Sequence, residues 1–326
     1  MENLPALTEF KKQSLLGQAC LAASRSHAPY SKQPCGAAVL TASGATYLGC
    51  TVDNAAYPNS SCAIRNAIAN AISSDSEKFS CNNENPFVRA CALISFYPGK
   101  YSIPCGVCRQ ALLEVGNFPV LLGMAYDSSQ PAANENINFI ETTVLQLMPY
   151  ASLTTSVARS NSFTSDPPEW WSEFFVTKVS ASDGLETDAI VQPLIVKAVE
   201  GAKLSYRPYS NFPVGAALAT NVGIVTGGNV ENESFQVCWC AERTAISKAI
   251  AAGATKIQAV AILCAKLEGE YAKPCGGCRQ SLVEFGNVTV YCLQYLGKGI
   301  WSYQKHGILD MLPGAFAPSS LQSTAS

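Results

Sequence analysis

Charged side chains are scarce in this sequence, and neither sign dominates. Only 14% of the 326 residues are Asp, Glu, Lys or Arg, and 22 basic residues stand against 24 acidic ones, for a net charge of −2. A protein that binds phosphate backbones normally presents a strongly basic face. The overall charge therefore argues against nucleic acid as a partner, although a local basic patch stays compatible with it.

Long apolar runs are also missing. No stretch reaches the roughly 20 apolar residues of a membrane-spanning helix, and residues 1–12 lack the apolar core of a secretory signal. We therefore expect no membrane partner and a cytoplasmic protein. In that setting the 14 cysteines indicate thiols and metal ligands rather than disulfides. Four lie in apolar surroundings and are better interpreted as small buried hydrophobic residues: Cys20, Cys91, Cys264 and Cys292.

The sequence does contain a tandem repeat. Its length suggests two domains, and its 48% of hydrophobic residues lets each half bury a core. Segments match in the same order between the halves: residues 30–39 with 209–218, 52–54 with 230–232, 62–67 with 240–245, 104–110 with 274–280 and 113–117 with 283–287. We expect a first domain over residues 1–151, a linker over 152–187 and a second domain over 188–326.

The linker is rich in Ser, Thr, Asp and Pro, but it is not uniformly polar. It contains four large aromatic residues, which we expect on a short helix that docks on a domain face: Trp170, Trp171, Phe174 and Phe175. A partner-binding stripe is the alternative interpretation of this cluster.

Hydrophobic periodicity in the second half predicts alternating helices and strands. Asp188 is the expected cap of the first helix. Helices are predicted over residues 188–204, 240–252 and 278–285, and strands over 215–218, 223–227, 257–264 and 288–293. This order is typical of the α/β class, with a sheet covered by helices.

Cysteines with metal-ligand spacing lie at the start of two of these helices. Cys240 opens one helix, and Cys275 and Cys278 open another in a Cys-x-x-Cys pattern. The amides and the positive dipole end at a helix start favour thiolate over thiol. Three thiolates leave one tetrahedral position open for water, which is typical of catalytic rather than structural zinc.

A carboxylate and two arginines accompany the cysteines. Glu242 follows Cys240 by two residues, and we expect it to take and deliver protons. By itself it would be interpreted as a glutamate favoured by the helix dipole. Arg243 and Arg279 directly follow the ligand segments, and we expect them to donate to the thiolates. Ordinary surface arginines are the alternative.

Two other interpretations of the cysteines carry less weight. A Cys-x-x-Cys pair can be a redox dithiol, and a zinc ribbon contains two such pairs about 15–20 residues apart. The two pairs in this chain begin 170 residues apart, at Cys105 and Cys275. Neither interpretation explains the cysteine-alanine element that precedes each pair.

With these residues, the second half resembles the cytidine deaminase family in its all-cysteine zinc class. The resemblance implies a three-layer α-β-α sandwich with a mixed sheet in each half. It also implies a Zn²⁺ cofactor and hydrolytic deamination of cytidine or deoxycytidine in pyrimidine salvage, with Glu242 as the catalytic residue. The implied substrate-binding residues are Asn229 and Glu231 for the ribose hydroxyl groups, Phe212 for the pyrimidine, and Ala241.

The first half departs from the family at most of these positions. Ile64 stands where the second half has Glu242, and Gln33, Thr51 and Asp53 stand where it has Phe212, Asn229 and Glu231. We therefore expect this half to be catalytically inactive. Its cysteines are retained as candidates for a second, non-catalytic metal site: Cys62, Cys105 and Cys108.

In the family that this chain resembles, single-domain members form tetramers whose subunits complete one another's sites. A tandem chain can replace two subunits, so the resemblance implies a homodimer that mimics the tetramer. Phe316 lies in a segment that approaches a neighbouring site in the family, and a packed terminal aromatic is the alternative.

Two rival functions stay open at this point. One is deamination of a polynucleotide or of another small cytosine compound. The acidic balance argues against a polynucleotide, and Asn229 with Glu231 favours a free nucleoside. The other is a binding or regulatory protein with purely structural zinc, which an intact Glu242 argues against.

Overall fold

The computed structural model describes residues 7–75, 87–96, 101–124, 137–148, 178–184, 186–232, 234, 237–264, 267, 269–315 and 317–318. They fall into two compact units. The first contains residues 1–52, 61–163 and 232–238, and the second contains residues 53–60, 164–231 and 239–326. A short segment of each half therefore belongs to the unit formed mainly by the other. No helix among the described residues is long and apolar enough to cross a bilayer.

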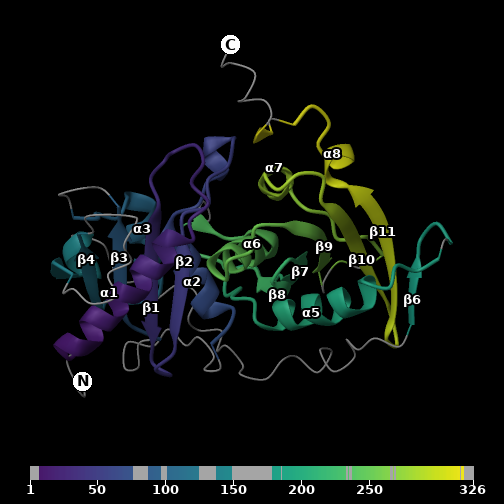
Figure 1. Ribbon diagram of the computed structural model, residues 1–326. Helices are drawn as coiled ribbons and strands as arrows, with labels where there is room; N and C mark the ends of the chain where they lie inside the picture. The colour runs from purple at the N-terminus through teal and green to yellow at the C-terminus, as the bar shows by residue number, and fades with distance from the viewer. Residues whose placement is uncertain are drawn as a thin grey trace, which may run out of the picture. The chain divides into compact units, whose positions relative to one another are not determined.

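The first unit is built around a five-stranded sheet in the order β2-β1-β3-β4-β5 (Figure 1). β3 and β4 are parallel, whereas the other neighbouring pairs are antiparallel. The elements are α1 (Glu9–Ser24), β1 (Cys35–Thr41), β2 (Thr46–Cys50), α2 (Ala63–Ile72), β3 (Val88–Ser95), α3 (Gly106–Glu114), β4 (Pro119–Gly123), β5 (Phe139–Thr143) and α4 (Val144–Leu147).

Helices cover both faces of this sheet. A Cβ on Gly36 of β1 would collide with the backbone of α1 at Ala19 and Ala23. A Cβ on Gly49 of β2 would collide with the backbone of α2 at Ala63 and Ala67. Gly49 pairs with Ala37, the residue after Gly36, and adjacent strand residues point to opposite faces. The first unit is therefore a three-layer sandwich.

The second unit repeats this plan with a six-stranded sheet in the order β6-β11-β10-β9-β7-β8 (Figure 1). β9 pairs in parallel with β10, and β6 with β11. The elements are β6 (Lys178–Ala181), α5 (Val191–Lys203), β7 (Val214–Thr220), β8 (Gly223–Gly228), α6 (Ala241–Ala251), β9 (Ile257–Cys264), α7 (Gly276–Val283), β10 (Thr289–Gly297), β11 (Ile300–Gly307) and α8 (Ile308–Met311), with the 3₁₀ turn η1 (Tyr57–Asn59) added from the first half.

The second sheet is also covered on both faces. Gly215 of β7 lies against the backbone of α5, and Gly227 of β8 lies against the backbone of α6. Gly227 pairs with Ala216, the neighbour of Gly215, so the two helices lie on opposite faces. The three-layer α-β-α sandwich with a mixed sheet, duplicated in tandem, is confirmed.

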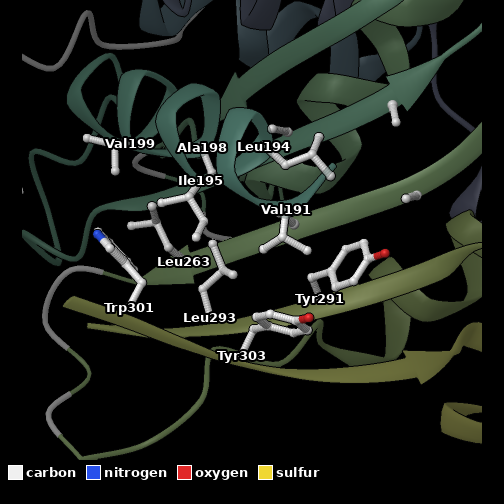
Figure 2. Packing of buried hydrophobic residues seen from close by; sticks show 14 of the residues in the cluster. Val191, Leu194, Ile195, Ala198, Val199, Leu263, Tyr291, Leu293, Trp301 and Tyr303 are labelled. Carbon is white, nitrogen blue, oxygen red and sulfur yellow. The ribbon is translucent and has the colours of Figure 1, made fainter. Parts of the chain in front are cut away.

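The core beneath α5 shows why this helix packs so closely (Figure 2). The central strands present small side chains such as Ala217 and Ala261, whereas β10 and β11 present large aromatic ones. Tyr291 and Tyr303 meet edge to face, with ring centroids 5.5 Å apart. Small residues beneath the helix let it approach the sheet closely, and large residues beside it complete the packed layer.

The predicted helix beginning at Asp188 was wrong at its start. α5 begins at Val191, and its N-cap Ile190 makes no side-chain capping bond. Asp188 instead accepts hydrogen bonds from Tyr291 at 2.8 Å and Lys305 at 2.9 Å. These partners hold the pKa of the Asp188 carboxyl below its usual value. The competing partners come from β10 and β11, more than 100 residues away in sequence.

Candidate active site

Chain topology brings the three candidate metal ligands of the second half, Cys240, Cys275 and Cys278, to one edge of the sheet. α6 follows β8 and α7 follows β9, and both strands run antiparallel to β7 between them. β8 and β9 therefore point the same way, and the helices that follow them start at the same edge. Cys240 is the N-cap of α6 and Cys275 is the N-cap of α7, as the sequence predicted.

The three sulfur atoms have the spacing that tetrahedral zinc requires. Cys240 Sγ lies 3.9 Å from Cys275 Sγ, which lies 3.5 Å from Cys278 Sγ. Zn–S bonds of about 2.3 Å in a tetrahedron separate sulfur pairs by about 3.8 Å. The three residues therefore fit a zinc ion. The fit leaves one of four coordination positions without a ligand from this triad.

The thiols share protons unequally, which differs from the expectation for two helix starts. Hydrogen bonding with Cys240 and Cys278 lowers the pKa of the Cys275 thiol. The same sharing raises the pKa of Cys240 to about 11 and also raises the pKa of Cys278. The helix termini are thus not the main cause of the shifts. A metal ion binding here would have to displace the protons that are retained.

Glu242 is held inside the protein next to these sulfurs. It lies in the first turn of α6, and only 3% of its surface is exposed. Burial raises the pKa of its carboxyl, opposed in part by a hydrogen bond with Cys278. A carboxyl with a raised pKa is better matched to proton transfer near neutral pH.

Of the two arginines expected at the thiolates of the second half, Arg243 reaches a sulfur. Its Nη2 lies 3.8 Å from Cys240 Sγ, and its guanidinium stacks over the Trp239 ring with Cζ 4.6 Å from the centroid. A cation over an indole ring is held in place by cation–π attraction. Trp239 was not among the residues predicted from the sequence, although its position directly before Cys240 was a usable signal.

Arg279 makes different contacts from those expected. Its Nε donates to the Pro274 carbonyl at 2.9 Å and its Nη1 donates to the Met311 carbonyl at 2.8 Å. Its described hydrogen bonds thus run to backbone oxygens and not to a thiolate. Arg279 fixes the backbone immediately before Cys275, so its influence on the ligand passes through position rather than charge.

The first unit keeps this framework without the carboxylate. The sulfurs of Cys62, Cys105 and Cys108 lie within 4.8 Å of one another, and Arg65 Nη2 lies 3.9 Å from Cys62 Sγ. Ile64 fills the place of Glu242 and is 1% exposed. The supporting arginine is also repeated, because Arg109 donates to the carbonyls of Pro104 and Leu147.

The predicted nucleoside-binding residues gather around one loop, residues 209–214. Asn229 Oδ1 accepts from Val214 N at 2.8 Å, and its Nδ2 donates to the Phe212 carbonyl at 3.0 Å. Phe212 itself is 40% exposed. Asn229 therefore shapes the loop that presents Phe212, a positioning role that the sequence did not indicate.

Glu231 is anchored to the same loop. Its Oε2 accepts from Tyr209 N at 2.9 Å and from Ser210 N at 3.0 Å, while its Oε1 accepts from the Ser210 hydroxyl. The loop continues through Asn211, whose φ of 52° is in the left-handed region that asparagine tolerates better than most residues. Two of the expected substrate residues thus cooperate in holding a single turn.

Two expectations fall outside the described residues. Phe316 is one, and the aromatic cluster of the linker, Trp170 to Phe175, is the other. Ala241 is described: it is the first residue of α6 and is fully buried. The expected domain limits also stay a prediction, since the compact units divide the chain by contact and not by sequence repeat.

The fold and the site together define a zinc-binding α/β protein with a buried carboxylate beside the metal ligands. The family described as "Cytidine and deoxycytidylate deaminase zinc-binding region" matches twice, over residues 190–294 and residues 2–84. The chain belongs to the cytidine deaminase family. Both halves carry the family's zinc-binding region, so the repeat is a repeat of that domain.

The match with each individual relative covers less than half of this chain but nearly all of the relative's own length. "Cytidine deaminase" of Sporosarcina psychrophila is 38% identical over 138 residues, 41% of this chain and 97% of its own length. "Probable cytidine deaminase" of Dictyostelium discoideum is 38% identical over 139 residues, 41% of this chain and 91% of its own. The crystal structure of cytidine deaminase from Burkholderia pseudomallei is 37% identical, covering 40% of this chain and 99% of that one, with a TM-score of 0.35.

Proposed function

We propose that residues 188–326 form the catalytic domain of a zinc-dependent cytidine deaminase, which converts cytidine or deoxycytidine and water to the uridine and ammonia. Residues 1–151 form a degenerate domain and residues 152–187 the linker. The observation that carries the proposal is the buried Glu242 beside three sulfurs at zinc spacing. Loss of the ultraviolet absorbance of cytidine on addition of the purified chain tests it directly.

Each residue of the site has a defined task in this reaction. Zinc held by Cys240, Cys275 and Cys278 would make water nucleophilic at neutral pH. Glu242 accepts a proton from the water that attacks C4 and delivers protons to the ring nitrogen and the departing amino group. The C4–O bond forms, the C4–N bond breaks, and ammonia leaves. Arg243 moderates the charge of the thiolates by donating to Cys240.

The residues around the loop 209–214 hold the nucleoside. Phe212, on the loop fixed by Asn229, packs on the pyrimidine, and Glu231 with Asn229 holds the sugar hydroxyl groups. Ala241 contributes its backbone amide, which is one of the donors that a helix start leaves without a partner inside the helix. An apolar ring and several polar groups around one turn suit a ligand with a flat base and a polar sugar.

Glu231→Gln is expected to lower kcat/KM for cytidine about 30-fold, because a charged hydrogen bond to a hydroxyl is worth about 1.5–3 kcal/mol. The same change also weakens the loop contacts at Tyr209 and Ser210. The comparison substrate is therefore 2′,3′-dideoxycytidine, which lacks both ring hydroxyls. For this substrate, the variant should lose only the part of kcat/KM that depends on the loop contacts. Equal losses on the two nucleosides would contradict a role in holding the sugar.

We also propose that the first unit holds a second, non-catalytic zinc ion. In each triad the sulfurs lie within 4.8 Å of one another, and Arg65 repeats the contact of Arg243. Two zinc ions per chain are expected by elemental analysis of protein purified without added metal. Cys105→Ser should reduce the zinc content to one ion per chain and keep turnover within a factor of two to three. Cys275→Ser, in the active triad, should abolish turnover. One zinc per wild-type chain would mean that the first triad is empty.

A homodimer with two active sites, acting in pyrimidine salvage, completes the proposal. Two chains supply four deaminase-type domains, the number that single-domain relatives would bring together as a tetramer. A cytoplasmic location agrees with the 13 described cysteines, all of which are free thiols. Light scattering of the purified protein would test the dimer, with a mass near 34.6 kDa counting against it.

A further inference from the structure

The segment Asp53–Ser60 belongs to the first half of the sequence but to the second compact unit. It is folded tightly on itself around η1. Asn54 N donates to Ser60 Oγ at 2.9 Å, and Ala56 N donates to Asn54 Oδ1 at 2.9 Å. Asn54 and Ala55 are each only 3% exposed. The segment is therefore held in shape by its own hydrogen bonds, with Asp53, Asn54 and Ala55 buried in the second unit and Tyr57 exposed.

This segment is hydrogen-bonded along one side of α7. Asn54 Nδ2 donates to the Gln280 carbonyl at 3.0 Å, and Gln280 Nε2 donates back to Asn54 Oδ1 at 3.2 Å. One turn further along, Ala55 N donates to Glu284 Oε2 at 2.9 Å. Glu284 is 7% exposed. Hydrogen bonds in such buried places are costly to lose, because water does not readily replace the missing partner.

α7 depends on contacts of this kind for its position. It is eight residues long and begins Gly276-Gly277, and glycine is a poor helix former. A helix of this length is not stable by itself in water. Cys275 caps it and Cys278 lies within it, so its placement sets the positions of two of the three sulfurs. The segment also passes close to the residues between them, since a Cβ on Gly277 would lie 3.3 Å from Asn59 Oδ1.

We propose that the segment Asp53–Ser60 positions α7 and thereby holds Cys275 and Cys278 at the spacing that zinc requires, with Asn54 as the main positioning residue. The inference rests on the proposed function, in that the triad is a zinc site. It assigns the catalytically degenerate half a direct task in the active site of the other half. Asn54 suits the task because its amide donates and accepts at once, which an apolar residue or a carboxylate does not do.

The test is zinc retention in the full-length chain. Asn54→Ala should speed zinc release from the second triad to a chromophoric chelator by about 10–100-fold, the usual effect of losing a group that orients metal ligands. Cys105→Ser in the background restricts the signal to that triad. Asn54→Asp keeps the acceptor and loses the donor, so its rate of zinc release should lie between those of Asn54→Ala and the wild type. It also serves if the alanine variant does not fold.

The matched control is Asn221→Ala. Asn221 Oδ1 accepts from Thr255 N and Lys256 N, both at 2.9 Å, at the far end of β7 from the site. Its loss should reduce stability and leave zinc release unchanged. Zinc release from Asn54→Ala at the wild-type rate, or equal acceleration by both variants, would overturn the proposal. Failure of the proposed function would appear separately, as wild-type protein without zinc or without turnover.

Discussion

Glu242→Ala is expected to abolish the deamination of cytidine and to leave the zinc in place. Glu242 is not one of the three ligands, and it is the buried carboxylate beside them. A positioned acid–base group contributes about 10²–10⁴-fold to a rate. Because Glu242 would serve both the attack on C4 and the departure of ammonia, we expect a loss of about 10³-fold or more in kcat. Absorbance assays and zinc content on the same preparation provide the measurement.

Two further variants separate chemistry from packing. Glu242→Gln preserves the shape of the side chain, but the amide does not accept a proton. Its kcat should therefore fall nearly as far as that of Glu242→Ala. Glu200→Ala removes a glutamate of α5 whose side chain is 45% exposed in a surface ion pair with Lys197. Such pairs contribute little, and turnover should stay within twofold. Near-normal activity in Glu242→Ala would disprove the proton-transfer role.

Gly215→Ala is expected to destabilise the second unit by about 3 kcal/mol, at the upper end of the usual cost of overpacking. A methyl group there would lie 2.6 Å from Ala202 N and closer still to the Ala198 carbonyl. These are backbone atoms of α5, so no side-chain rotation relieves the collision. Trp239 and Trp301 are buried in the second unit, so tryptophan fluorescence during urea unfolding reports on it.

Gly276→Ala provides the comparison for this experiment. An added Cβ at Gly276 meets no atom within 4 Å, and alanine at a helix start is not strained. Its free energy of unfolding should stay within about 0.5 kcal/mol of the wild-type value. A wild-type midpoint for Gly215→Ala would mean that α5 does not approach β7 as closely as the structure shows.

The parts of the site that depend on local sequence could be predicted well. Cys240 and Cys275 were expected at helix starts and are the N-caps of α6 and α7. The hairpin around Asn221 and the strand over residues 257–264 also agree with β7, β8 and β9. Each of these features is set by turn chemistry or by the alternation of apolar residues over a few positions.

Features that depend on distant partners could not be predicted in this way. Asp188 was expected to cap a helix, but it bonds to Tyr291 and Lys305. β6 and β11 pair across more than 100 residues, and neither has a strong local signal. Arg279 directly follows a ligand segment, as Arg243 does, and was likewise expected to donate to a thiolate. It donates to backbone carbonyls instead.

The family and the repeat follow from the sequence alone, and so do the predictions that three cysteines bind the metal and that Ile64 replaces the counterpart of Glu242. These follow from residue types at fixed spacing, because coordination and proton transfer require particular functional groups. By contrast, the three-dimensional fold was needed to show that the segment Asp53–Ser60 lies in the second unit, hydrogen-bonded to α7 through Asn54. That contact joins residues 226 positions apart. It depends on where the segment Asp53–Ser60 and the helix α7 are placed within the second unit, which no local pattern specifies.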